Sequence, residues 1–305
     1  MTAIGRYVLV LVVALVMASA TPARAQFVVA ERETLDFDRP ESWGMKYYAS
    51  LALLTSMGVP ERRAAGVVDL GFEGSYVPQM SDEQRRIGFN GTKLEDVNKT
   101  RFFGRVRGSV GLGKGLALEL GYTPPIEVGG AKPNILAVAL GRPFDLSPSW
   151  RLGVRGYGQV GTIEADITCS AGEVAAGDDP VQNPFQCVEP SEDESRQKAV
   201  GLELVAGYDG TSRFKPYLGL GLNYMDLEFH VNAIYSNGLV EDHTVQLTSG
   251  TTLSASAGMT FEASPRFRIT GELFYSWLSI VRPPTASSAN EGFFNGRIFV
   301  SYRIR

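Results

Sequence analysis

Long apolar runs are almost absent from this chain of 305 residues. After residue 25, no stretch of about 18 consecutive apolar residues occurs, which excludes a membrane-spanning helix in that part of the sequence. Histidine and cysteine are scarce, with two of each, so few side chains could serve as a catalytic base or as zinc ligands. The sequence also lacks a glycine-rich phosphate loop, a nucleotide-binding motif and a basic nucleic-acid patch. We therefore predict no cofactor, no metal site and no nucleic-acid partner.

The one strongly apolar segment lies at the N-terminus. Arg6 precedes an uninterrupted apolar run over residues 7–17, and Ala23-Arg24-Ala25 provides a small-x-small cleavage site. The run is shorter than the roughly 20 residues that a membrane anchor needs, and Thr21-Pro22 follows it. Residues 1–25 are therefore predicted to be a secretory signal peptide.

The rest of the chain is rich in alternation between apolar and polar residues. The even positions of residues 214–224 are apolar, and so are the odd positions of residues 253–261. Side chains of a strand point to opposite faces in turn, so each run predicts a strand with one apolar face. Asn237-Gly238 between them is the preferred pair for a two-residue type I′ turn. This turn predicts a register in which paired residue numbers add up to 475, with Leu222 opposite Leu253.

The same alternation predicts ten strands between residues 66 and 305. Short links are expected at residues 113–115, 142–149, 209–213 and 263–266. Longer links are expected at residues 78–99, 123–134, 167–196, 235–242 and 281–292. In bacterial membrane barrels the short turns are periplasmic and the long loops lie outside the cell. The pattern therefore predicts an all-β, antiparallel up-and-down transmembrane barrel with an extracellular loop at 167–196.

Residues 26–65 leave the strand count open. A further strand is suggested by the alternating residues Tyr47, Ala49, Leu51, Leu53 and Thr55. It would be the eleventh, and an even count then needs one more strand from about residue 28 to 37. The same segment also fits a helix, with Asp38 as its cap, Pro40 and Glu41 in its first turn, and Gly58 and Pro60 after its end. We expect about twelve strands, with ten strands and an N-terminal helix that plugs or lines the barrel as the alternative.

The polar face of the strands carries many charges. A charge that faces lipid costs roughly 2–4 kcal/mol at the bilayer midplane, so these side chains are expected to face the lumen. The lumen-lining candidates are Arg101, Arg105, Arg107, Glu119, Arg151, Arg155, Glu203, Arg268, Glu272, Arg297 and Arg303. Their basic excess predicts a narrow pore or binding conduit for small solutes that favours anions. A ladder of Arg–Glu pairs that closes the lumen explains the same residues, and such a barrel would have a structural role or act through its surface loops.

The only two cysteines, Cys169 and Cys187, both fall in the polar segment 167–196. In an exported protein they would be oxidised to a disulfide. The bond would close a loop of roughly 19 residues and stabilise it by about 3 kcal/mol.

The two histidines raise the question of an enzyme. In the expected register His230 and His243 are diagonal neighbours near the outer rim, on the same face as Glu228. Such a group could support acid–base hydrolysis at the rim. A solvated rim above the membrane explains these residues more simply. We therefore expect no enzyme and assign no catalytic residue.

Taken together, the chain resembles outer-membrane β-barrel proteins of Gram-negative bacteria over nearly all of residues 66–305. The resemblance rests on the signal peptide, the alternation, the loop asymmetry and the final strand at 299–305. Tyrosine and tryptophan at strand ends, such as Tyr122 and Trp150, match the aromatic girdles of this class. The resemblance implies the outer membrane as the location, and its lipids and the barrel-assembly machinery as partners. Such proteins usually end in an aromatic residue, whereas the last aromatic here is Tyr302.

Overall fold

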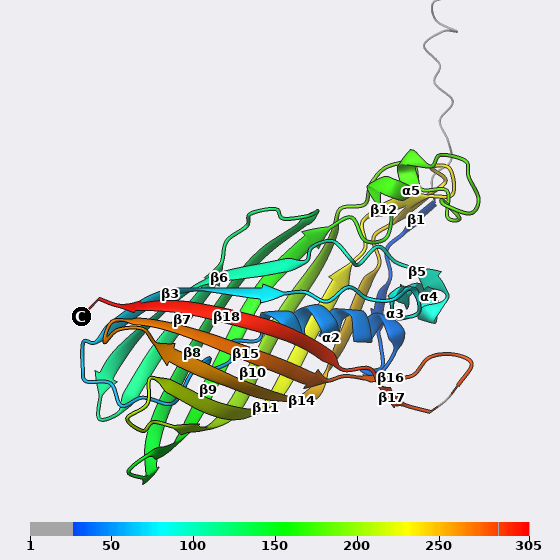
Figure 1. The fold of residues 1–305 in the computed structure, drawn as a ribbon. Helices are drawn as coiled ribbons and strands as arrows, with labels where there is room; N and C mark the ends of the chain where they lie inside the picture. Colours follow the sequence, from blue (N-terminus) through cyan, green and yellow to red (C-terminus); the bar gives the residue numbers. More distant parts are fainter. Residues whose placement is uncertain (1–26, 286, 305) are drawn as a thin grey trace, which may run out of the picture.

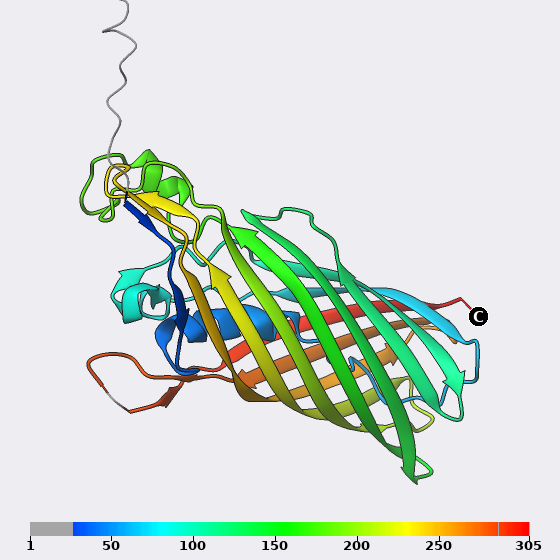
Figure 2. The same cartoon turned by 180° about the vertical axis from the view of Figure 1, so that it is seen from behind.

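Ten long antiparallel strands form a closed barrel (Figure 1, Figure 2). The computed structural model describes residues 27–285 and 287–304, so the predicted signal peptide lies outside the described residues. The barrel strands are β3 (Val68–Tyr76), β6 (Phe102–Gly113), β7 (Leu116–Thr123), β8 (Ala131–Ser147), β9 (Trp150–Ala165), β10 (Asp193–Tyr208), β11 (Phe214–His230), β14 (Val245–Glu262), β15 (Phe267–Trp277) and β18 (Phe293–Arg303). Each pairs with its neighbours in chain order, and β18 pairs with β3, which closes the sheet. The barrel architecture that the sequence predicted is confirmed.

The register of the β11–β14 ribbon is the predicted one. Phe214 lies opposite Phe261, and Leu222 lies opposite Leu253. Asn237 and Gly238 both have positive φ angles, as a type I′ turn requires. Between this turn and the barrel, the short strands β12 (Ala233–Tyr235) and β13 (Val240–Asp242) keep the same register. The turn chemistry and the alternation therefore specify one pairing over the whole ribbon.

The prediction of about twelve strands is wrong, and the alternative of ten strands with an N-terminal helix is confirmed. Residues 27–34 form two short strands outside the barrel wall, β1 (Phe27–Val29) and β2 (Arg32–Thr34). They pair in parallel with β13 and with the outer end of β14. Helix α2 (Pro40–Ala52) follows and lies inside the barrel (Figure 1).

The alternation in residues 47–55 led to the wrong strand count because side chains on both faces of this segment are buried. Tyr48, Ala52 and Leu54 occupy the other parity, and Leu54 is as fully buried as Leu53. A segment that is apolar all round suits a buried helix better than a strand with one wet face. The helix also begins one residue later than the Asp38 cap predicts, with Arg39 at the N-cap, and it ends at Ala52, well before Gly58.

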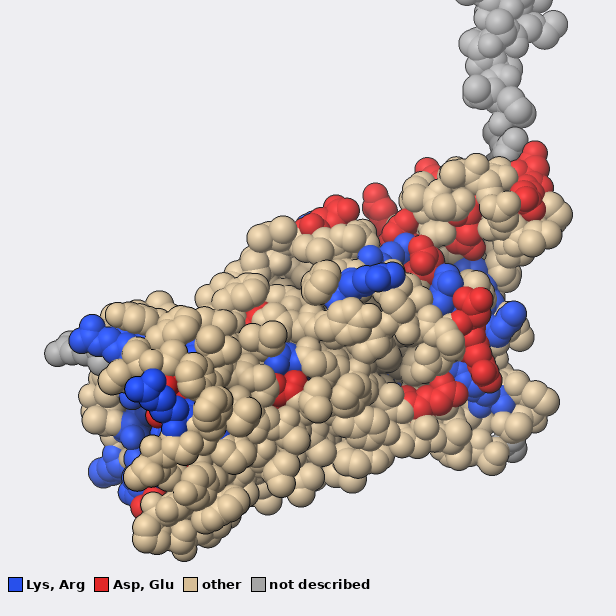
Figure 3. Space-filling view, in the orientation of Figure 1, with Lys and Arg blue, Asp and Glu red and all other residues tan. Residues whose placement is uncertain are grey.

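The outer surface of the barrel carries an apolar belt. Leu218, Leu220 and Leu253 point outward and are all more than half exposed. In the face shown in Figure 3, charged side chains gather at the two ends of the molecule, and a mostly uncharged band lies between them. Above Tyr224 the outward face of β11 becomes polar, beginning at Asp226. A belt of this kind on a closed barrel is the surface that meets lipid.

The two ends of the barrel differ. One end, here called the short-turn end, has tight connections such as residues 209–213 and 263–266. The other, here called the long-loop end, carries the elements α3 (Asp82–Arg85), β4 (Arg86–Ile87), α4 (Gly88–Gly91), β5 (Lys93–Leu94), α5 (Ala171–Ala175), β16 (Ser279–Ile280) and β17 (Ala289–Asn290). No helix in residues 27–285 and 287–304 is long and apolar enough to cross a membrane.

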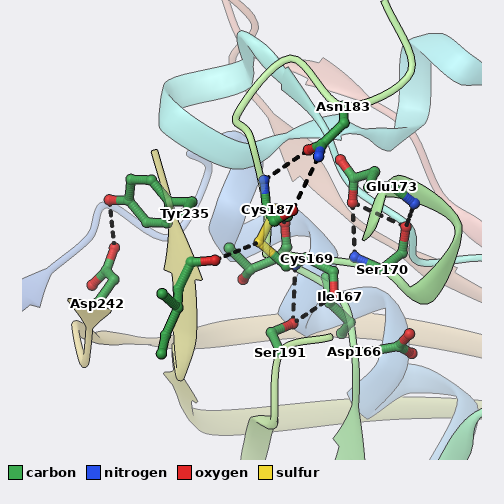
Figure 4. Close-up of a disulfide and its surroundings, with 12 residues drawn as sticks. Asp166, Ile167, Cys169, Ser170, Glu173, Asn183, Cys187, Ser191, Tyr235 and Asp242 are labelled. Atoms are coloured by element: carbon green, nitrogen blue, oxygen red, sulfur yellow. Dashed lines mark hydrogen bonds between the residues drawn. A yellow bond between two sulfur atoms is a disulfide. The ribbon is translucent and has the colours of Figure 1, made fainter. Parts of the chain in front are cut away.

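The predicted disulfide is present at the long-loop end (Figure 4). Cys169 and Cys187 are bonded and buried, with their Cα atoms 5.7 Å apart. Asn183 accepts a hydrogen bond from the Cys187 N–H at 2.8 Å, and Ser191 accepts one from the Cys169 N–H at 3.0 Å. The loop is slightly shorter than predicted, since β10 already begins at Asp193.

Candidate functional site: a plugged lumen between two cavities

Four lumen arginines bind the main chain of the N-terminal segment. The last residues of α2 and the irregular residues after it, 53–57, pass through the middle of the barrel. Arg105 donates to the Ala52 carbonyl at 2.9 Å, and Arg297 donates to the Leu53 carbonyl at 3.0 Å. The final carbonyls of a helix have no partner within it and carry partial negative charge, so guanidinium groups stabilise them.

The other two arginines hold the residues that follow. Arg107 donates to the Thr55 carbonyl at 2.6 Å, and Arg155 donates to the Leu54 carbonyl. Here α2 together with residues 53–57 is called the plug. The plug is therefore anchored through its backbone by side chains of β6, β9 and β18.

Three buried glutamates and the partly buried Glu119 balance these arginines. Glu73 accepts from both Arg105 and Arg107 at 2.9 Å. Glu119 contacts Arg107 and Arg155, and Arg155 also reaches Glu203 at 3.0 Å. The fourth carboxylate, that of Glu272, accepts from the plug hydroxyl Thr55 Oγ1 at 2.7 Å and from Tyr217 at 3.0 Å. This arginine–glutamate layer thus has four charges of each sign and closes the lumen around the plug.

The remaining basic candidates, apart from Arg101, lie at the short-turn end. Arg268 pairs with Glu61 at 2.7 Å and with Asp69 at 2.6 Å, and Arg303 reaches the same two carboxylates. Arg151 pairs with Asp209 at 2.5 Å. A cavity of about 130 Å³ lies between this cluster and the plug. Apart from residues of the arginine–glutamate layer, its walls carry four basic and three acidic residues, so a basic excess of one is found at this mouth.

Arg101 is an exception among the predicted lumen residues. It lies before the first residue of β6 and is exposed at the long-loop end. Arg101 has an odd number, as do the residues of β6 that face the lumen. However, the strand that would direct its side chain inward begins only at Phe102. The sequence-based assignment of Arg101 to the lumen is therefore wrong.

Several lumen residues that charge-based reasoning did not single out are also distinctive. Gln159 on β9 and Gln197 on β10 are buried on the lumen face, and neither amide has a hydrogen-bond partner among the described residues. Unpaired buried atoms also occur on Ser75, Thr123 and Asn295. In the sequence they are marked only by their positions, which alternate in step with the inward-facing residues of their strands. An uncharged polar side chain gives no indication in the sequence that its hydrogen-bond partner will be missing.

A second and larger cavity lies at the long-loop end, on the other side of the plug. Its volume is about 310 Å³. The first turns of α2 contribute Arg39, Glu41, Met45 and Tyr48, and the other walls come from residues 29–33, 87–97, 167–168 and the outer ends of β10 to β14. Here this cavity is called the chamber. The plug therefore divides the lumen into two compartments, the chamber and the short-turn cavity.

The two histidines do not combine into a single group. His230 contacts Glu228 at 3.1 Å, whereas His243 contacts Glu241 at 2.9 Å. Each therefore pairs with a carboxylate two residues away in the chain. Among the residues that the structure describes, no group of three or more histidine, cysteine, aspartate or glutamate side chains could hold a metal ion.

The closed barrel, its apolar belt and its charged lumen define a transmembrane β-barrel of the outer-membrane type. The predicted location in the outer membrane is confirmed by this architecture.

Comparison with known proteins adds the following. No family model matches the chain, and no curated protein matches it in sequence. Among solved structures, it is similar to the outer membrane protease OmpT from Escherichia coli, with 9% identity and a TM-score of 0.39 over 78% of this chain and 94% of that one. It is also similar to Ail, the attachment invasion locus protein of Yersinia pestis, with 13% identity and a TM-score of 0.32 over 79% and 99% of the two chains. An outer membrane channel from Pseudomonas putida F1 has 7% identity and a TM-score of 0.38 over 83% and 100%.

Proposed function

We propose that this protein is a conduit for small solutes that its own plug holds closed at rest. Solute would enter the chamber from outside the cell, and passage would require residues 53–57 to leave the arginine–glutamate layer. Outer-membrane lipids surround the belt in this proposal, and the barrel-assembly machinery inserts the chain. No catalytic step is assigned to it.

The observation that carries this proposal is a local gap in the polar contacts of the lumen, at two glutamine side chains. Gln159 and Gln197 face the lumen, yet both amides are buried without a hydrogen-bond partner among the described residues. A buried polar group without a hydrogen bond costs about 1–3 kcal/mol. Water that entered on withdrawal of the plug would satisfy these amides, which offsets part of the free energy of opening.

The anchoring of the plug also suits a reversible closure. The four arginines hold it mainly through main-chain carbonyls, and each keeps a glutamate or asparagine partner of the wall when those bonds are lost. Opening therefore leaves no lumen arginine without an acceptor.

A disulfide lock tests the proposal directly. Ser50 Oγ on α2 lies 3.3 Å from Ser276 Oγ on β15, and both residues are buried. Cysteines at these positions in a Ser50→Cys/Ser276→Cys variant are close enough to bond. In planar bilayers, we expect the wild type to show rare openings, the oxidised variant to show none, and dithiothreitol to restore them.

Two controls accompany this experiment. The wild type with dithiothreitol reports any effect of reducing Cys169–Cys187, and Ser50→Cys alone reports the effect of the substitution. A third variant that lacks residues 27–57 should conduct continuously. If that deletion variant inserts but passes no current, the lumen is not a conduit.

A second candidate function is favoured by the balanced arginine–glutamate layer. Four charges of each sign around a filled lumen fit a closed barrel that acts through its loops. This function predicts no conductance from the wild type or from the lock variant in either redox state. Replacement of His230 and His243 by alanine, with lipid and peptide hydrolysis as the readout, tests the remaining possibility of a rim-site enzyme.

A further inference from the structure

The chamber at the long-loop end combines aromatic walls with an excess of negative charge. The rings of Tyr48, Phe89, Phe229 and Tyr235 line it. Its volume of about 310 Å³ lies within the range of sites that bind small organic molecules.

The charged residues of the chamber wall are mostly acidic. They are Glu31, Glu33, Glu41, Glu95, Asp242 and Arg39. The guanidinium of Arg39 is already engaged, at 2.8 Å from Glu33 and 3.0 Å from Glu41. Lys93 pairs with Glu95. Apart from the Glu95–Lys93 pair, four carboxylates less Arg39 leave three negative charges, and Glu31 has no ion pair among the described residues.

We propose that the chamber binds a small organic cation with an apolar or aromatic body, such as a substituted ammonium. Carboxylates attract the positive charge, and aromatic faces attract an organic cation through their quadrupoles. An anion would be repelled by the same walls. A neutral apolar molecule would displace water from the carboxylates without replacing its hydrogen bonds, which is unfavourable.

This assignment depends on the chamber walls and not on whether the plug moves. Binding can therefore be measured in the closed state, and a failure to bind is distinguishable from a failure to conduct.

Titration calorimetry of the full mature chain in nanodiscs of zwitterionic lipid tests the assignment. The probe is benzyltrimethylammonium, compared with benzenesulfonate as an anion and benzyl alcohol as a neutral aromatic molecule. Empty nanodiscs provide the blank for partition into lipid. We expect saturable binding of the ammonium only.

Two variants place the binding in the chamber. Glu31→Gln should weaken ammonium binding about threefold to tenfold, because it removes one facing charge. Phe229→Leu keeps an apolar wall but removes a ring, and it should weaken binding about two- to fivefold. Glu189→Gln is the matched control, since Glu189 is exposed at the same end of the molecule and does not line the chamber. Its affinity should equal that of the wild type.

Heat-modifiable gel migration verifies that each variant is folded. The assignment is overturned if folded wild-type protein does not bind the ammonium, if it binds the anion or the neutral molecule as tightly, or if Glu31→Gln and Glu189→Gln have the same effect.

Discussion

In the lumen, each buried charged side chain is stabilised by neighbouring side chains of opposite charge. Glu73 is fully buried and receives hydrogen bonds from Arg105 and Arg107, while both arginines also hold carbonyls of the plug. Removing one partner of such a group leaves uncompensated charge in a dry environment, which is far more costly than losing an exposed pair.

The variant Glu73→Gln should therefore lose about 3–5 kcal/mol of unfolding free energy. Glu164→Gln is the control, because its ion pair with Lys132 is about half exposed and should contribute at most about 1 kcal/mol. Urea unfolding in lipid bilayers, followed by tryptophan fluorescence, measures both. Equal losses in the two variants would contradict the assigned role of the arginine–glutamate layer.

Glu95 makes the stability of the long-loop end depend on pH. Burial raises the pKa of this carboxyl to about 7, with Lys93 opposing the shift and Asp193 and Glu173 adding to it. The Glu95 carboxyl therefore binds its proton more tightly in the folded loop than in the unfolded chain, where it has the ordinary pKa of a glutamate. Stability is therefore lost as pH rises from about 4.5 to about 7.

We expect amides around residues 92–97 to exchange faster at pH 7.5 than at pH 5.5, after correction for the intrinsic exchange rate. In Glu95→Gln this difference should disappear. Mass-spectrometric hydrogen exchange provides the measurement. A pH difference that persists in the variant would assign the effect to another group.

Among the elements, the loop between β9 and β10 depends on its disulfide. The bond closes a segment that has little regular structure beyond α5, whose N-terminus Ser170 and Glu173 cap reciprocally. Cross-linking such a segment restricts its unfolded states and stabilises it by about 3 kcal/mol.

In the double variant Cys169→Ser/Cys187→Ser, residues 166–192 should become sensitive to protease while the barrel stays intact. Limited proteolysis of whole cells, followed by gel migration of the remaining barrel, measures both parts. Loss of heat-modifiable migration would show instead that the disulfide supports the barrel itself.

For the whole molecule, the boundary of the belt fixes its depth in the bilayer. Leu220 lies near the middle of the apolar face of β11, whereas Ser249 lies on the outward face of β14, beyond the boundary at Tyr224 and Thr251. The same charge introduced at these two positions therefore meets different surroundings.

Leu220→Arg should cost roughly 2–4 kcal/mol of unfolding free energy in lipid bilayers, and Ser249→Arg about 0–1 kcal/mol. Both are measured by reversible urea unfolding in short-chain lipid vesicles. A cost at Ser249 as large as that at Leu220 would move the boundary outward.

Much of this architecture was predictable because strand alternation and turn chemistry are local. Asn237-Gly238 and the apolar parity of residues 214–224 were sufficient to give the pairing of Phe214 with Phe261, and the spacing of links gave the ten barrel strands. Most of the predicted lumen residues face inward for the same reason. Arg101 does not face inward, because alternation along the sequence does not show at which residue a strand begins.

The partners of those lumen residues were not predictable. Arg105 and Arg297 were expected to face either water or glutamates. Their contacts with carbonyls of the plug depend on a segment that is more than 50 residues away for Arg105 and more than 240 for Arg297. Gln159 and Gln197 gave no signal, since a missing hydrogen bond exists only after the plug fills the lumen.

By itself, the sequence determined the barrel, its register, its outward belt and its disulfide, since each follows from periodicity or from a pair of residues. Only the tertiary structure decided that residues 40–57 enter the lumen as a helix followed by an irregular segment. The physical reason is that a closed wall with inward charges leaves a space that must be filled, and which segment fills it depends on contacts between distant parts of the chain.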